Sequence, residues 1–274
     1  MINTFKKVLF ISSLLLLLSP IQLLASDKAK DVIKDGNELL TVGRYKDAIN
    51  YYNQAIESDP NYIDAYIYKG VALWALQEYR DAIDILNKAV QIAPDVMNQD
   101  VVFGDNFKVY FIIADSYFKL KQYDNVIKQF QLVSDDKSIN VDDYILWLRL
   151  MAYQLNNINQ YQYALQLYNL PFIVQQNNPE VYCDKAESYF GLKQYDDVIK
   201  QFQLAAKCLS LKIDNYLYSL QGMSSKLMEI KQYQYAISLY DLALLKQPNN
   251  GDILNAKNDA EKALEAAQKA KSSK

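Results

Sequence analysis

The feature that most constrains this chain is a segment that recurs 72 residues further along. Ser116–Leu132 reads SYFKLKQYDNVIKQFQL, and Ser188–Leu204 reads SYFGLKQYDDVIKQFQL. The same offset relates Gln160–Leu170 to Gln232–Leu242. A copied block of this length is the sequence signature of a repeat architecture, in which one supersecondary unit stacks on the next.

A shorter spacing divides the chain into units of 34 to 44 residues. A tyrosine that precedes an alanine or valine by three residues marks each unit. Large apolar residues flank a small residue at spacings of 3, 4 and 7, which is one face of an α-helix. Each unit is therefore predicted to contain two amphipathic helices that approach closely at the small residue. The small residues are Gly36, Gly70, Ala114, Ala152, Ala186 and Ser224.

This pattern resembles the tetratricopeptide repeat over residues 27–250. The resemblance implies an all-α fold, an α-solenoid of stacked antiparallel helix hairpins that forms a right-handed superhelix with a concave inner face. Residues 251–274 are expected to form a C-terminal capping helix with a frayed tail. Members of the family are usually protein-interaction scaffolds. The six expected units span 29–62, 63–96, 107–144, 145–178, 179–216 and 217–250.

Departures from the repeat pattern lead to local expectations. Pro171 stands inside a second helix, so we expect a break near Leu170. Ten extra residues, Met97–Asn106, follow the second unit, and their apolar tip is either tucked in or turned toward a partner. No strand is expected in residues 27–250. Asp252 is expected to cap a last helix from about 252 to 270. The apolar stripe of that helix is read as Leu254, Ala260, Ala263, Leu264 and Ala267.

Residues 1–25 have the composition of a signal peptide. Lys6 and Lys7 precede the apolar run Val8–Leu18, and small residues precede Ser26. We therefore expect an exported protein, periplasmic or secreted, and the alternative is an uncleaved N-terminal membrane anchor. Cleavage would change the formal net charge from −3 to −5 because it removes the two lysines.

The composition argues against catalysis, metal binding and nucleic-acid binding. The chain has no histidine, which removes the commonest general base and the imidazole metal ligand. A mildly acidic surface is a poor match for phosphates, and no Gly-rich phosphate loop predicts a cofactor. Cys183 and Cys208 are too far apart for a CxxC motif. They are read as small buried hydrophobes with Cys208 late in a second helix, and a disulfide is the alternative.

Several positions that the repeat framework leaves free are aromatic or apolar. The resemblance places them on the first helices, which line the groove in this family. We predict that they bind an extended or helical segment of another protein, and packing against the next hairpin is the alternative. Asn37 and Lys108 are scattered remnants of the set with which related domains grip a terminal carboxylate. The predicted partner-binding residues are Trp74, Phe111, Phe118, Tyr153, Phe190 and Met228.

The leading hypothesis is an exported, non-enzymatic scaffold that binds another protein and inserts no segment into a membrane once the signal is removed. The alternative is a self-assembling structural protein, a homo-oligomer whose own ends or grooves pair. A third hypothesis, with the least support, is a hydrolase that acts on cell-wall material. The sequence specifies neither the partner nor the stoichiometry.

Overall fold

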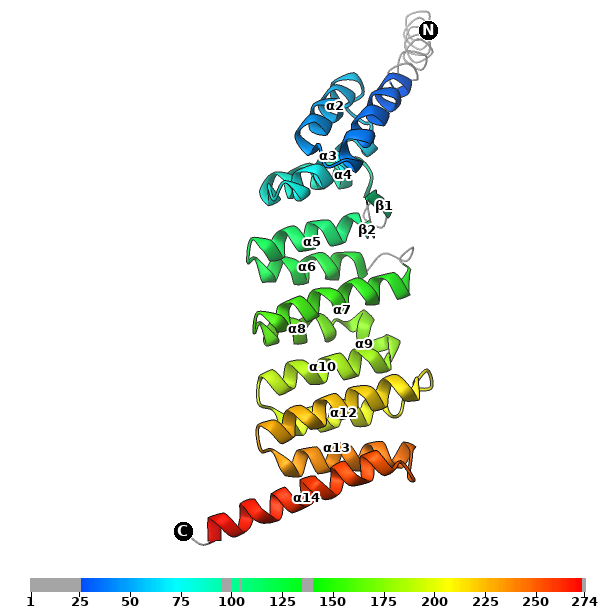
Figure 1. Cartoon of the computed structure of the whole chain (residues 1–274). Coiled ribbons are helices and arrows are strands. Elements are labelled where there is room, and N and C mark those ends of the chain that lie inside the picture. The colour runs from blue at the N-terminus through cyan, green and yellow to red at the C-terminus, as the bar shows by residue number, and fades with distance from the viewer. Residues whose placement is uncertain (1–25, 95–99, 104, 135–139, 273–274) are drawn as a thin grey trace, which may run out of the picture. The chain divides into compact units, whose positions relative to one another are not determined.

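The computed structural model describes residues 26–94, 100–103, 105–134 and 140–272 (Figure 1). The predicted signal peptide lies outside the described residues. The described chain consists of α-helices and one short β-hairpin, which confirms the predicted all-α class. It divides into two compact units, Met1–Ile139 and Asn140–Lys274, and each is considered by itself. None of the described helices is long and apolar enough to cross a membrane.

The first unit is a stack of helix pairs. The turn between the two helices of a pair contains a residue with positive φ: Gly43, Gln77 and Lys121 in successive pairs. The helices are residues 26–41 with α2 (Tyr45–Ser58), α3 (Ile63–Ala75) with α4 (Tyr79–Ile92), and α5 (Val109–Lys119) with α6 (Tyr123–Ser134).

The second unit repeats this arrangement and ends with an additional helix. Its pairs are α7 (Val141–Asn157) with α8 (Tyr161–Tyr168), α10 (Pro179–Gly191) with α11 (Tyr195–Ala205), and α12 (Ile213–Glu229) with α13 (Tyr233–Lys246). A short helix, α9 (Pro171–Gln176), follows α8, and α14 (Gly251–Ser272) packs on α13.

The break expected at Pro171 is confirmed. Helix α8 ends at Tyr168, and Pro171 opens α9 as its first residue. A proline has no N–H to donate to the preceding turn, but it is well suited to the first position of a new helix.

The core of each pair forms where a small residue of the first helix faces a large residue of the second. A Cβ atom added to Gly70 would lie 2.5 Å from Leu86, and one added to Gly36 would lie 2.7 Å from Tyr52. Tyrosines supply much of the buried volume. Five of the largest fully buried side chains are Tyr52, Tyr110, Tyr144, Tyr168 and Tyr216.

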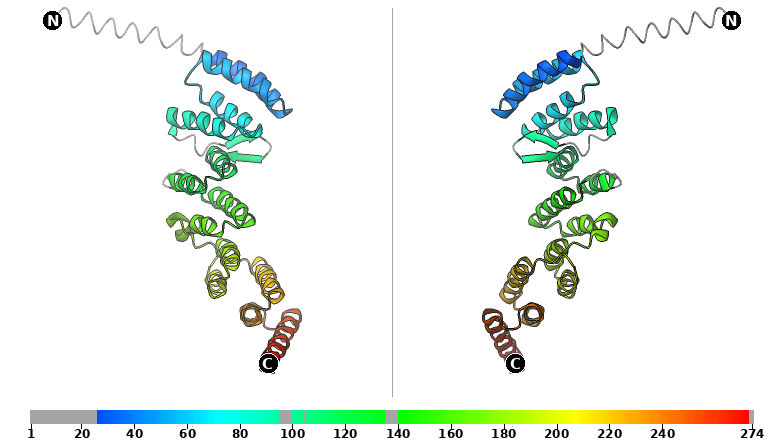
Figure 2. Two further views of the ribbon diagram at one scale, coloured as in Figure 1. Left: turned by 90° about the vertical axis from the view of Figure 1, so that its left-hand side faces the viewer. Right: turned by 90° about the vertical axis from the view of Figure 1, so that its right-hand side faces the viewer.

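The expectation of no strand in residues 27–250 is wrong at the insertion between α4 and α5. Strands β1 (Asp100–Phe103) and β2 (Asp105–Lys108) form an antiparallel hairpin there (Figure 2). Val101 pairs with Phe107, and Val102 pairs with Asn106. Valine and phenylalanine favour extended backbone, and the insertion is long enough for one strand to fold back on the other.

The last helix begins differently from the prediction. The side-chain Oδ1 of Asn250 accepts hydrogen bonds from the backbone N–H groups of Asp252 and Ile253, at 3.1 Å each. Asn250, rather than Asp252, is therefore the capping residue. Ile253 and Ala260, seven residues apart, are buried, whereas Leu254 is 39% exposed. Leu254 lies about 100° around the helix from Ile253, so it turns away from α13.

This arrangement predicts unequal effects of two adjacent truncations. Ile253→Ala should lower the free energy of unfolding by about 2 kcal/mol or more, because it empties a buried site. Leu254→Ala should cost less than about 1 kcal/mol, because this side chain already contacts solvent. Urea unfolding followed by circular dichroism measures both. Equal losses for the two variants would mean that α14 does not pack on α13 through Ile253.

Candidate functional site

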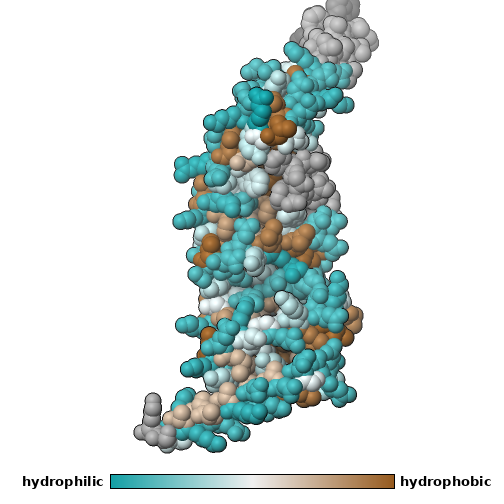
Figure 3. All heavy atoms as spheres, in the orientation of Figure 1, coloured by the Kyte–Doolittle hydropathy of each residue, from teal (hydrophilic) through white to brown (hydrophobic). Residues whose placement is uncertain are grey.

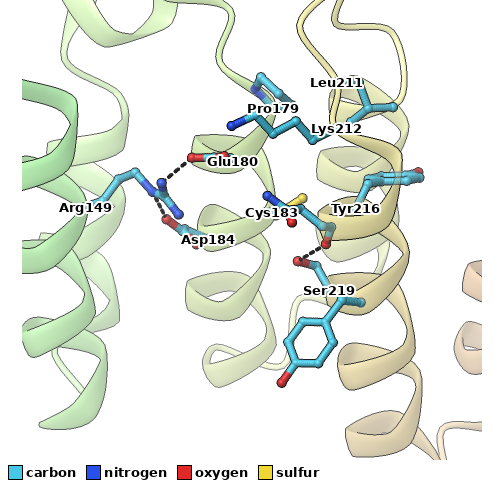
Figure 4. Close-up of a pocket in the computed structure, with 11 residues that line it drawn as sticks. Arg149, Pro179, Glu180, Cys183, Asp184, Leu211, Lys212, Tyr216 and Ser219 are labelled. Carbon is cyan, nitrogen blue, oxygen red and sulfur yellow. Dashed lines mark hydrogen bonds and ion pairs between the residues drawn. The ribbon is translucent and has the colours of Figure 1, made fainter. Parts of the chain in front are cut away.

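The first helices of the second unit, α7, α10 and α12, line two clefts. The large cleft, of about 760 Å³, lies mainly between α7 and α10. The small cleft, of about 370 Å³, lies mainly between α10 and α12 (Figure 4). Arg149 and Asp184 line both clefts, so these two side chains stand between them.

Arg149 joins α7 to α10 by two ion pairs. Its Nε donates to Asp184 Oδ2 and its Nη1 donates to Glu180 Oε2, both at 2.5 Å (Figure 4). Glu180 and Asp184 are one helical turn apart on α10, so one planar guanidinium reaches both. Burial raises the pKa of Asp184, although the hydrogen bond and charge of Arg149 act to lower it. The three side chains remain about a third exposed, so their contribution is mainly to geometry rather than to stability.

Two further polar contacts connect the same three helices. Ser188 Oγ of α10 donates to Asn156 Oδ1 of α7 at 2.9 Å. Lys226 Nζ of α12 donates to Glu187 Oε2 of α10 at 2.6 Å. The charged groups in the large cleft are therefore paired with one another across the helices.

Between these pairs, α7 exposes a row of apolar side chains. Leu146 is 55% exposed, Leu150 is 38% exposed and Tyr153 is 62% exposed. Their spacing of four and three residues places them on one face of α7, and all three line the large cleft. We call this set the α7 row. In the space-filling view, hydrophobic patches lie among hydrophilic side chains at the level of α7 (Figure 3).

The small cleft contains a thiol that is held in its neutral form. Burial raises the pKa of Cys183 to about 12, and the nearby Asp184 carboxylate acts in the same direction. Ser219 acts to lower this pKa, but burial outweighs it. The Ser219 hydroxyl donates to Asn215 O, one turn earlier on α12, at 3.0 Å. Because the thiolate is the nucleophilic form of cysteine, this site does not favour covalent chemistry.

The second cysteine lies apart from this cleft, and both thiols are free. Cys208 follows the end of α11 rather than lying inside it, which corrects its predicted position. Its Sγ contacts Leu204 O at 3.5 Å and Asn177 Oδ1 at 3.7 Å.

The structure brings together two of the six predicted partner-binding residues. Tyr153 and Phe190 both line the large cleft. Met228 of α12 is partly buried against the core of the second unit and does not line either cleft.

The other three predicted residues belong to the first unit. Phe111 is 3% exposed and therefore offers a partner almost no surface. The Phe118 ring packs against Tyr123 with ring centroids 6.0 Å apart, and the Lys119 ammonium lies 5.6 Å from the Phe118 centroid.

Trp74 forms a hydrogen bond within the first unit. Its indole Nε1 donates to Asp115 Oδ2 at 2.7 Å, which connects α3 to α5. Asp115 is 3% exposed, and Lys119 Nζ lies 4.0 Å from its other carboxylate oxygen. Burial raises the pKa of Asp115, against the smaller lowering effects of Trp74 and Lys119. Packing against the next hairpin, the alternative for this tryptophan, is what the structure shows.

Sequence reasoning missed Leu146 and Leu150. The sequence pattern could have identified them, because the two leucines flank Arg149 on the same helix face as Tyr153. Asn37, read as a remnant of a carboxylate-binding set, has a structural contact: its Oδ1 accepts from the Tyr52 hydroxyl at 2.9 Å.

The comparison with protein families supports the repeat pattern in part of the first unit. Residues 34–96 match the tetratricopeptide repeat family model. MamA is similar at 17% identity over 65% of this chain and 90% of its own, with a TM-score of 0.47. PilF of Pseudomonas aeruginosa is similar at 16% identity over 85% of this chain and 99% of its own, with a TM-score of 0.46. YrrB is described as a tetratricopeptide repeat (TPR) protein with an unusual peptide-binding site. It is similar at 16% identity over 83% of this chain and 90% of its own, with a TM-score of 0.36. A search of curated proteins found no match.

The buried carboxylate of the first unit predicts a pH-dependent effect. The folded-state pKa of Asp115 is raised, so its charged form costs stability above that pKa, and the cost disappears as the pH falls through it. Asp115→Asn keeps an acceptor for Trp74 and should therefore raise the melting temperature at pH 7. The difference from wild type should shrink toward pH 4.

The exposed Asp84, past the first turn of α4, provides the matched control. Asp84→Asn should leave the melting temperature nearly unchanged at both pH values. A marked loss of stability for Asp115→Asn at pH 7 would instead show that the ionised carboxylate is needed by Trp74 and Lys119.

Proposed function

We propose that α7, α10 and α12 of the second unit bind a segment of another protein, and that the chain is an exported, non-enzymatic scaffold. The observation that carries this proposal is the α7 row, which is exposed in a cleft of about 760 Å³. Exposed apolar surface rimmed by polar residues is typical of protein-interaction sites.

Polar contacts between α7, α10 and α12 hold the helix that carries the α7 row in place. Arg149 fixes α7 to α10, and Lys226 fixes α12 to α10. A surface that is arranged before binding loses less conformational entropy when the partner arrives. The Tyr153 ring in particular offers a large contact area with few rotatable bonds.

The form of the large cleft favours a macromolecular ligand over a small one. Its lining extends along α7 from Leu146 to Asn157, which is about three turns of helix. Small-molecule sites bury most of their ligand in a closed cavity. Because the charges in the cleft are paired with one another, binding should depend little on salt concentration.

A site-specific photo-crosslinker tests the surface. A benzoylphenylalanine introduced at Tyr153 should capture a partner in the native host, whereas the same residue at Leu245 of α13, 76% exposed, should not. The captured protein is then purified and its affinity is measured by calorimetry. Tyr153→Ser should weaken binding about 10-fold or more, as expected for an aromatic hot spot.

Two results would contradict the proposal. Equal capture at Tyr153 and Leu245 would indicate non-specific contact rather than a binding site. Exclusive capture of a second copy of this chain, together with concentration-dependent mass in light scattering, would favour the self-assembling alternative.

The proposed export makes a separate prediction. Mass spectrometry of the protein purified from its native host should find an N-terminus at Ser26, because the preceding residues have the form of a cleavage site. A chain that keeps Met1 and fractionates with membranes would support the uncleaved anchor instead.

A further inference from the structure

We infer that the large cleft takes an amphipathic α-helix of the partner, whose uncharged apolar stripe packs on the α7 row. This inference rests on the function proposed above and names the kind of segment that is bound. Three observations carry it: the internal duplication, the pairing of polar groups in the cleft, and the spacing of the α7 row.

The duplication provides an internal comparison, because its offset of 72 residues relates α7 to α12. Core positions are kept: Leu148 and Met151 correspond to Leu220 and Met223, and all four are at most 1% exposed. The two helices therefore share most of their buried residues, although Ile145 corresponds to Leu217 and Ala152 to Ser224.

The outer face is kept only in part. Leu146 corresponds to Tyr218, which is 81% exposed, but the other two members of the α7 row have no large counterpart. Leu150 corresponds to Gly222, and Tyr153 corresponds to Ser225. A Cβ atom added to Gly222 would meet nothing within 4 Å, so this position on α12 is open. Since the copied helix folds without large side chains at these two positions, the leucine and tyrosine on α7 are not demanded by the fold. Their exposure in the large cleft makes them available for contact with another molecule.

The polar groups of the cleft favour a helix over an extended segment. An extended chain needs hydrogen-bond partners for its backbone N–H and C=O groups. The main polar side chains of the cleft keep further donors and acceptors, but bonds across the helices orient them toward one another, so an extended backbone would compete with these contacts. A helix satisfies its backbone internally and needs only apolar contact. The committed side chains are Arg149, Asn156, Asp184, Glu187 and Lys226.

The spacing of the α7 row fits the stripe of another helix. Leu146 and Tyr153 are seven residues apart, a rise of roughly 10 Å at 1.5 Å per residue. A partner stripe at i, i+4 and i+7 has the same length, and such ridges interlock when helices pack. Every residue of α10 is buried or only partly exposed, so α10 forms a recessed floor beside the α7 row. The acidic side chains of α10 are paired with opposite charges on α7 and α12. The cleft therefore favours an uncharged stripe on the partner helix.

Two displayed peptide libraries test the inference on the full chain. Both contain 18-residue peptides with randomised residues at i, i+4 and i+7 in an Ala, Gln, Glu and Lys host. The second library has proline at regular host positions, which prevents a helix. We expect the helix-forming library alone to yield binders, and Tyr153→Ser to weaken these about 10-fold or more.

Substitutions taken from the duplicated helix keep the test independent of folding. Tyr153→Ser introduces the residue that α12 carries at the equivalent exposed position. The double variant Gly222→Leu, Ser225→Tyr builds a similar row on α12 and should change the affinity of the selected peptides less than 2-fold. Thermal melts of all variants should agree with wild type within a few degrees.

The outcomes separate the two proposals. Binders that come only from the proline library and depend on Tyr153 would overturn the helical partner and leave the proposed binding surface intact. Binders that are insensitive to Tyr153→Ser, or no binders from either library, would contradict both proposals. A 10-fold gain of affinity in the α12 double variant would show general hydrophobic adhesion and overturn the helix inference.

Discussion

The close approach of two helices at one small residue is the constraint on which the rest of this structure depends. At Gly70 there is no room for even one additional carbon atom in front of Leu86, and Gly36 stands in the same relation to Tyr52. This packing fixes the inner faces of each hairpin and buries the large framework residues. The outer faces of the first helices are thereby left free to differ from one hairpin to the next. The α7 row is one such difference.

The framework could be predicted from the sequence because its determinants are local. Small and large residues at spacings of 3, 4 and 7 define each hairpin, and Pro171 marks the break in the fourth. The ends of elements were less accurate: Asn250 and Asp252 are both good capping residues, and only the structure shows which one accepts the N–H groups of α14. Packing on α13, which local sequence does not specify, likewise buries Ile253 rather than Leu254.

The candidate site could be predicted only in part, because its contacts connect residues far apart in the chain. Arg149 and Asp184 are separated by 35 positions, and Trp74 and Asp115 by 41. Periodicity places each of these residues on a first helix but does not say which ones meet. It therefore grouped Trp74 with Tyr153, although one donates to a buried carboxylate and the other is exposed in a cleft. The duplicated positions Asp115 and Glu187 show the same point, since the first bonds to the preceding first helix and the second to the following one.

The duplication also has a consequence for how the chain reaches its native state. The second helices α6 and α11 are nearly identical in sequence, and the first helices that follow them, α7 and α12, share most of their buried residues. Within the second unit, α7 can therefore compete with α12 for the surface of α10 and α11 while the chain folds. The entropy of closing the chain between such partners rises only slowly with its length, so the correct order depends on contacts that only one copy makes. Repeat proteins with near-identical neighbours are prone to this kind of misassembly. The polar contacts peculiar to one copy, such as Arg149 with Asp184, favour the correct order because α12 carries Gln221 at that position.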